Sequence, residues 1–188
     1  MKIVGLLGST VGTTTRTALS YALKTVSEHY PEAEMQILDL AEYDVQFSDG
    51  RHFLDYSGDT GHIAKTLMSA DAILIGSPTF QASIPGALKN VLDLLPADGF
   101  RDKVVGTLMS AGTPKHFLVA EQQLRPILRY MKAELVPEHV FVEAKDVYQG
   151  EIINDDVAMR LERLAEELVR YARLQEQLQL DREAAYAF

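Results

Sequence analysis

The sequence contains neither cysteine nor tryptophan. Without cysteine, a disulfide framework, a zinc–thiolate site and a thiol nucleophile are all excluded. No stretch approaches the roughly 18 consecutive apolar residues that a membrane-spanning helix requires. The first apolar run, residues 3–7, is also too short for the hydrophobic segment of a signal peptide. We therefore expect a soluble, cytoplasmic protein.

Basic residues are scarce, with 18 lysines and arginines against 27 aspartates and glutamates, so the net charge is −9. This charge makes nucleic acid and anionic membranes poor partners. It does not exclude a phosphorylated small molecule, because backbone N–H groups at a helix N-terminus bind phosphate without any net positive charge. The length of 188 residues and the hydrophobic content of 47% predict one domain over residues 1–188.

Short apolar runs alternate with helical patterns along the chain. The predicted strands are residues 2–7, 35–40, 71–76, 103–110 and 135–142. Helical spacing of apolar residues predicts helices over 14–30 and from 154 or 155 to about 180, and a further helix face within 117–131. Right-handed crossovers between such strands give an α/β three-layer sandwich, with a five-stranded parallel sheet in the order 2-1-3-4-5.

Two segments have no clear pattern. Residues 43–61 show no periodicity and contain Asp49-Gly50 and Ser57-Gly58, so we expect a long loop there. Residues 175–188 mix charged side chains with leucines and aromatics. Their composition fits either a frayed tail or a segment that docks on a partner subunit.

The first of three notable loops, residues 8–17, joins the first strand to the first helix and contains six serines and threonines. Hydroxyl groups and backbone N–H groups at a helix start bind anions, and the helix dipole strengthens that binding. The spacing matches neither GxGxxG nor the P-loop. A helix cap alone needs only one such side chain, so the sequence predicts phosphate binding. The candidate residues are Ser9, Thr14, Thr15, Arg16 and Thr17.

The second loop follows the third strand. Its candidate binding residues are Pro78, Thr79, Phe80 and Gln81. Thr79 and Gln81 can hydrogen-bond a heterocycle or a ribityl chain, and Phe80 offers an apolar contact to a flat ring. The alternative is that Phe80 belongs to the core and Pro78 only ends the strand.

The third loop follows the fourth strand, and its candidate residues are Ser110, Ala111, Gly112 and Thr113. Small residues let backbone N–H groups approach a ligand closely. Open α/β sheets bind their ligands at the carboxyl ends of the strands, where all three loops begin. The three loops together predict a flavin site.

The segment from Ser77-Pro78-Thr79-Phe80 to Gly86-Ala87-Leu88-Lys89-Asn90 resembles the NADPH-dependent FMN reductase family. Residues 86–96 and 112–128 are similar to the reductase components of two-component alkanesulfonate monooxygenases. The resemblance covers roughly residues 2–168. It implies a flavodoxin-like fold, FMN held by the three loops, NADPH as hydride donor, and a homodimer or homotetramer built from helices near the flavin.

Two positions depart from the family pattern. Val11 stands where the phosphate loop often has an arginine, so Arg16 is expected to supply the cation. Gln122 stands where sulfonate-type reductases usually carry a tyrosine associated with flavin transfer. This second departure leaves open whether FMN is exchanged or stays bound.

The function that the resemblance implies is hydride transfer from NADPH to FMN and on to free flavin, a quinone or another acceptor. A flavin-dependent monooxygenase is a candidate partner. Two alternatives remain: a flavodoxin-type electron carrier without NADPH oxidation of its own, and a flavin-free signalling or scaffold domain. We expect subunit contacts at helices near 85–95 and 115–131, because apolar residues fall on more than one face of the first. The alternative is that the extra apolar residues are buried under the loop at 43–61.

Overall fold

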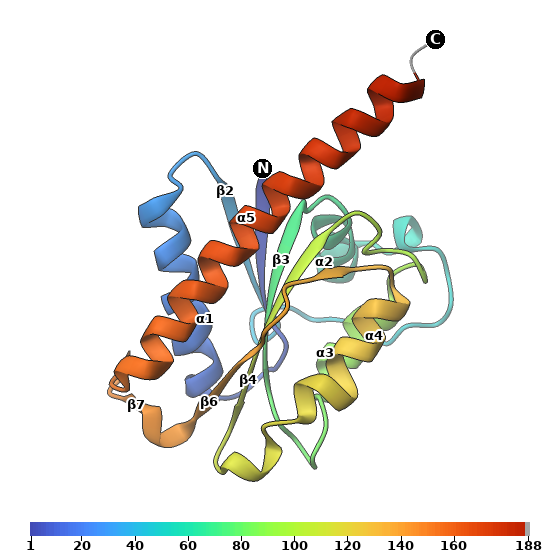
Figure 1. Cartoon of the computed structure of the whole chain (residues 1–188). Helices are drawn as coiled ribbons and strands as arrows, with labels where there is room; N and C mark the ends of the chain where they lie inside the picture. Colours follow the sequence, from blue (N-terminus) through green and yellow to red (C-terminus); the bar gives the residue numbers. More distant parts are fainter. Residues whose placement is uncertain (187–188) are drawn as a thin grey trace.

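The computed structural model describes residues 1–186 and contains a central parallel sheet (Figure 1). Strands β1 (Lys2–Leu7), β2 (Glu34–Asp39), β3 (Ala72–Pro78) and β4 (Val104–Ala111) lie in the order β2-β1-β3-β4. Two short strands, β5 (Glu134–Leu135) and β6 (Val140–Glu143), share the next position and both pair with β4. The predicted order is confirmed, but the predicted single fifth strand is wrong.

The fifth strand is split for a visible reason. Pro137 has no N–H group to donate to a neighbouring strand. The buried guanidinium of Arg125 donates to the carbonyl oxygens of Val136 and Pro137, each at 3.0 Å. The carbonyl groups of Val136 and Pro137 therefore hydrogen-bond a side chain, while the Val136 N–H still donates to Val105 of β4 at 3.0 Å.

Helices cover both faces of the sheet (Figure 1). Helices α1 (Thr13–His29) and α5 (Asp155–Tyr186) pack on one face, and α2 (Gly58–Met68), α3 (Gly86–Asp93) and α4 (Arg125–Tyr130) pack on the other. Neighbouring residues of β3 alternate between the two cores: Leu74 contributes to the first, and Ile73 and Ile75 contribute to the second. The structure is the predicted three-layer sandwich with a flavodoxin-like fold.

The segment expected to be a long loop is more ordered than its composition indicated. A short 3₁₀ turn, η1, occupies Phe53–Asp55, and α2 begins at Gly58. The remaining loop is attached to α3, because the Asn90 side-chain amide donates to the Gln46 carbonyl and accepts from the Ser48 N–H. The loop therefore covers α3.

Helix α5 continues well beyond the point where the pattern predicted it to end. Asn154 caps its start by accepting the Asp156 N–H at 3.1 Å. Near its other end, the side chains of Gln175 and Arg182 both donate to the Asp102 carboxylate. The tail is thus helical as far as residue 186 and contacts its own chain at Asp102; residues 187 and 188 of the predicted tail lie outside the described part.

Gly61 in the first turn of α2 and Gly86 in the first turn of α3 should respond in opposite ways to substitution by alanine. A Cβ at Gly61 would lie 2.2 Å from the Tyr56 carbonyl oxygen, whereas a Cβ at Gly86 would meet nothing within 4 Å. Gly61→Ala should therefore lower the free energy of unfolding by at least about 2 kcal/mol. Gly86→Ala, the matched control, should leave it unchanged or raise it by up to about 1 kcal/mol. Urea denaturation measures both, and equal effects would contradict the packing described here.

Candidate functional site

The three loops identified in the sequence meet at the carboxyl edge of the sheet. The Gly8 N–H donates to the Gly76 carbonyl at 2.8 Å, which joins the ends of β1 and β3. The Thr79 N–H donates to the Ser110 carbonyl at 2.8 Å, which joins the ends of β3 and β4. The hydroxyl groups of Thr15 and Ser110 are 2.6 Å apart and hydrogen-bond each other. One site therefore contains residues from all three loops.

The N-terminus of α1 is open. Its N-cap residue is Gly12, with φ 107°, and no side chain caps the helix. The N–H groups of the first turn, at Thr13, Thr14 and Thr15, have no partners within the helix. A Cβ added at Gly12 would meet nothing within 4 Å, so the space beside it is free. This geometry, with the helix dipole behind it, suits an anion.

The side chains of the first loop have more varied roles than predicted. The Ser9 hydroxyl donates to the Val11 carbonyl at 2.8 Å and accepts the Val11 N–H at 3.2 Å, so it shapes the loop itself. Thr15 is only 3% exposed and points toward β4. Thr14 and Thr17 are half-buried. The backbone at the helix start, more than its hydroxyl groups, offers donors to a ligand.

Arg16 makes an ion pair that sequence reasoning missed. Its guanidinium contacts the carboxylate of Asp39, the buried last residue of β2. Asp39 also accepts the Ala41 N–H at 3.0 Å. Arg16, the cation predicted for the phosphate, is therefore held beside the first loop, and the Asp39 carboxylate offsets part of its charge. An acidic residue at the end of an apolar strand was the available signal.

The second loop contains a strained turn and a free hydroxyl. Phe80 and Ser83 exchange two backbone hydrogen bonds of 2.9 Å. Between them Gln81 and Ala82 have φ values of 47° and 57°, a conformation that costs a non-glycine residue about 1–3 kcal/mol and tends to mark functional sites. Among the described residues, the buried Thr79 Oγ1 has no hydrogen-bond partner. An orphaned buried hydroxyl of this kind suits a polar ligand.

The third loop is shorter than predicted. Ser110 and Ala111 belong to β4, because β6 pairs with them and prolongs the sheet. Gly112 has open space around it, and the Thr113 hydroxyl accepts the Lys115 N–H at 3.1 Å at the start of a 3₁₀ turn, η2 (Pro114–His116). Only Gly112 and Thr113 of the predicted residues are loop residues.

A π-helical turn, η3 (Ala120–Leu124), follows the third loop and corrects the predicted helix face. Phe117 and Leu118 are exposed, not buried as their spacing indicated. The Ser83 hydroxyl donates to the Gln123 side-chain oxygen at 3.3 Å, so the second loop contacts this turn. Gln122 lies in the turn and is exposed.

Charged side chains fix the π-helical turn to the β5–β6 connection. One Glu121 oxygen lies 2.9 Å from Arg125 Nε and 3.2 Å from His139 Nδ1. His139 Nε2 lies 3.0 Å from the Phe117 carbonyl oxygen. Burial lowers the pKa of Arg125, and the Glu121 carboxylate acts in the opposite direction. The cluster links the backbone near the third loop to the edge of the sheet.

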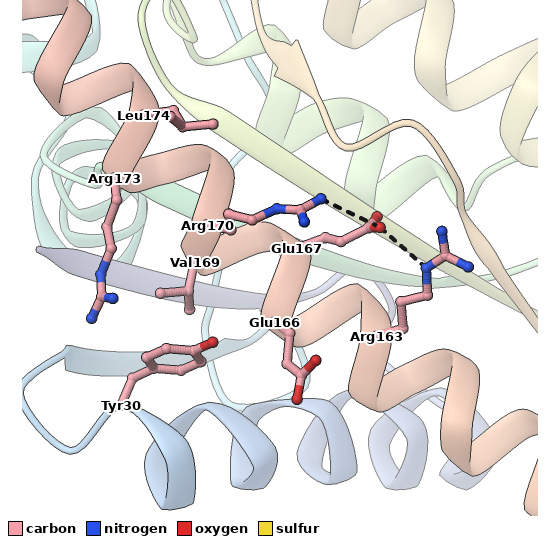
Figure 2. Close-up of a pocket in the computed structure, with 8 residues that line it drawn as sticks. All are labelled: Tyr30, Arg163, Glu166, Glu167, Val169, Arg170, Arg173 and Leu174. Atoms are coloured by element: carbon pink, nitrogen blue, oxygen red, sulfur yellow. Dashed lines mark hydrogen bonds and ion pairs between the residues drawn. The ribbon is translucent and has the colours of Figure 1, made fainter.

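A cavity of about 640 Å³ lies elsewhere, between the outer face of α5 and Tyr30 (Figure 2). Three of its charged side chains pair with one another, since Glu167 accepts from Arg163 at 3.1 Å and lies 3.8 Å from Arg170. Tyr30 follows the C-terminus of α1, whereas the three loops border its N-terminus. This cavity is separate from the site at the carboxyl edge.

The site fits a phosphorylated cofactor with a flat ring. The uncapped helix start suits the phosphate, and the orphaned Thr79 hydroxyl suits a polar ring or chain. Phe80 is 39% exposed at the tip of the second loop, so it is available for an apolar contact and is not a core residue.

A family model described as NADPH-dependent FMN reductase matches residues 1–147. The chain belongs to this family. Membership identifies the protein as a flavoprotein oxidoreductase with FMN and NADPH as its cofactors, which agrees with the fold and with the chemistry of the site. The family assignment and the function predicted from the sequence are confirmed.

Individual relatives agree with the family. The NAD(P)H-dependent FAD/FMN reductase of Geobacillus thermodenitrificans is 38% identical over 170 residues, which cover 90% of this chain and 92% of the relative. The FMN reductase (NADPH) of Escherichia coli is 37% identical over 81 residues, 43% of this chain and 42% of that protein. A solved NADH:FMN oxidoreductase has a TM-score of 0.74 and 25% identity, covering 89% of this chain and 87% of its own.

The hydrogen bond between Thr15 and Ser110 can be tested by a double-mutant cycle. Thr15→Val or Ser110→Ala alone leaves one buried hydroxyl unpaired and should lower the free energy of unfolding by about 1–3 kcal/mol. The double variant should lose less than the sum of the two, with a coupling energy of about 1 kcal/mol or more.

Thr107→Val is the matched control for this cycle. Thr107 is also buried in the sheet, but its hydroxyl has no partner within residues 1–186. Its replacement should leave stability unchanged or increase it slightly. Additive losses in the cycle, measured by urea denaturation, would show that Thr15 and Ser110 do not act as a pair.

Proposed function

We propose that residues 1–188 form a single FMN-binding domain in which the FMN phosphate binds at the start of α1 and the ring lies between the second and third loops. The observation that carries this proposal is the uncapped N-terminus of α1, which Thr15 joins to Ser110, the residue whose carbonyl accepts the Thr79 N–H of the second loop. The residues proposed for the phosphate are Ser9, Thr14, Thr15, Arg16 and Thr17, of which Thr15 offers its backbone N–H group because its hydroxyl bonds Ser110. The residues proposed for the ring and the ribityl chain are Pro78, Thr79, Phe80, Gln81, Ser110, Ala111, Gly112 and Thr113.

Bound FMN supplies the redox chemistry, accepting a hydride from NADPH and passing electrons to a second substrate. The role of the protein chain is to bind the cofactor and to orient it. First-turn N–H groups of α1 hold the phosphate, and the free Thr79 hydroxyl donates to the heterocycle or the ribityl chain. Backbone N–H groups at Gly112 and Thr113 would hold the ring of bound FMN and would stabilise the negative charge that its reduction produces. None of these roles requires an acid–base pair.

The second substrate is free flavin, which a flavin-dependent monooxygenase then uses. Family membership favours this reading over a flavodoxin-type carrier, because a carrier depends on a separate reductase. The resemblance of residues 86–96 and 112–128 to sulfonate-type reductases supports the monooxygenase partner. The cytoplasmic location expected from the sequence stays a prediction.

The purified protein alone should oxidise NADPH when FMN is added, with a rate that saturates in FMN. Replacing both Ser9 and Thr14 by alanine should weaken FMN binding by about 1–3 kcal/mol, because Thr14 loses a donor to a charged group and the first loop loses the Ser9 hydroxyl that shapes it. The KM for NADPH should not change. Thr10→Ala, in the same loop and exposed, serves as the control.

Two results would contradict the proposal. Wild-type protein that does not oxidise NADPH without a second protein would favour the carrier. An unchanged FMN affinity in the Ser9 and Thr14 double variant would remove the phosphate from the first loop.

We also propose that the chain forms a homodimer or homotetramer through α3 and α4. The original reason for this expectation was wrong: Leu88, Val91 and Leu92 of α3 are buried within the chain, partly under Tyr43 and Val45. A different feature supports it. A groove of about 510 Å³ lies between α3 and α4, and Tyr130 beside it is 70% exposed.

Sedimentation analysis at micromolar concentration should give a species of at least twice the 20.9 kDa chain mass. Tyr130→Glu should shift it toward the monomer, because burial of an unpaired carboxylate in the interface is costly. Monomeric wild-type protein would contradict the proposal.

A further inference from the structure

A separate groove of about 500 Å³ begins beside the first loop. One wall is the outer side of α1, with Arg16, Thr17, Ser20 and Lys24. The other wall is a hairpin formed by β7 (Val147–Tyr148) and β8 (Glu151–Ile152). Its size lies within the range of about 300–1,000 Å³ typical of small-molecule sites. The FMN site proposed above does not include this groove beyond Arg16 and Thr17.

Arg16 and Thr17 belong both to the first loop and to the groove. If the FMN phosphate binds at the start of α1, as proposed above, the groove starts at that phosphate. FAD differs from FMN by an adenosine monophosphate attached to the same phosphate. We propose that this groove binds the adenosine monophosphate half of FAD, so that the protein takes FAD as well as FMN.

The groove has a suitable group at each position along such a ligand. Arg16 and Thr17 lie where the second phosphate would be. Ser20 is exposed one turn further on and can hydrogen-bond the ribose. Lys24 follows Arg16 by about 12 Å along the helix, at the far end, where its ammonium group can lie against the face of adenine. The groove thus offers cations and hydroxyl groups, although Arg16 also pairs with Asp39 and Lys24 lies 3.7 Å from Glu28. Glu151 lines the hairpin wall and is the acidic group of the groove lining.

Tyr21 provides the aromatic surface of the groove. Its hydroxyl donates to a Glu162 carboxylate oxygen at 2.6 Å, which fixes the ring between α1 and α5. This hydrogen bond raises the pKa of Tyr21 to about 12, so the phenol stays protonated at ordinary pH. Tyr21 and Ile152 both line the groove, and a flat base has an aromatic and an aliphatic side chain to pack against.

NADPH also carries an adenosine phosphate, but NADPH fits the groove less well than FAD does. Its nicotinamide must reach the flavin ring, which lies toward the second and third loops. The groove extends from the phosphate along α1 instead. The adenosine half of FAD reaches the groove through one covalent link, whereas that of NADPH would have to cross the phosphate site.

Ser20→Tyr fills the groove, and Ser27→Tyr makes the same change on α1 outside it; both serines are exposed. The dissociation constants of FAD and FMN are measured by flavin fluorescence quenching without NADPH. Wild-type protein should bind both flavins. Ser20→Tyr should weaken FAD binding about tenfold, the scale of one lost base–aromatic contact, and leave FMN binding unchanged. Ser27→Tyr should change neither.

The other outcomes each overturn a stated claim. Wild-type protein that binds FMN but not FAD, or an FAD affinity that Ser20→Tyr leaves unchanged or lowers no more than it lowers FMN affinity, overturns the groove assignment. A raised KM for NADPH with FMN as acceptor, without loss of FAD affinity, assigns the groove to NADPH instead. Wild-type protein that binds neither flavin overturns the proposed function itself.

Discussion

The close contact between the carboxyl ends of β1, β3 and β4 is the constraint on which the site depends. Two glycines permit it: a Cβ at Gly8 would lie 2.8 Å from a Leu88 methyl group, and a Cβ at Gly76 would lie 3.1 Å from a Thr15 methyl group. Because Thr15 sits against β3 and bonds Ser110 of β4, the first turn of α1 is held close to the sheet. The helix N-terminus therefore opens onto the same edge as the other two loops.

This arrangement would let a chain with a net charge of −9 hold the phosphate that we propose for the first loop. The cation nearest the first loop, Arg16, already pairs with buried Asp39. Most of the attraction must then come from the backbone N–H groups and dipole of α1, which act over a few ångströms. Net charge governs long-range encounter, whereas these fixed donors govern binding at the site. The same reasoning applies to the groove along α1, because its cations and hydroxyl groups would act on a ligand at short range whatever the net charge of the chain.

The sequence predicted what depends on local periodicity and missed what depends on distant contacts. Continuous apolar runs identified the strands, and the crossover rule ordered them. The break between β5 and β6 had one signal in the sequence, Pro137, but its second cause, the side chain of Arg125, is in no strand pattern. The exposure of Phe117 follows from the π-helical turn after it, which changes the register of a helical repeat. The position of Thr15 in the first loop predicted a phosphate ligand. The fold shows that its hydroxyl points inward and bonds Ser110 instead.

The second and third loops are also connected to each other, with consequences for how the site can move. The strained Gln81-Ala82 turn persists because Phe80 and Ser83 bond across it. Ser83 reaches Gln123, and the turn containing Gln123 is fixed to the edge of the sheet through Glu121. A displacement of the second loop must therefore break contacts with the π-helical turn or carry that turn along. The first loop is tied separately, through Thr15 to β4. The phosphate end of the site is consequently fixed to the sheet, and the ring end is fixed to a chain of polar contacts that can open together.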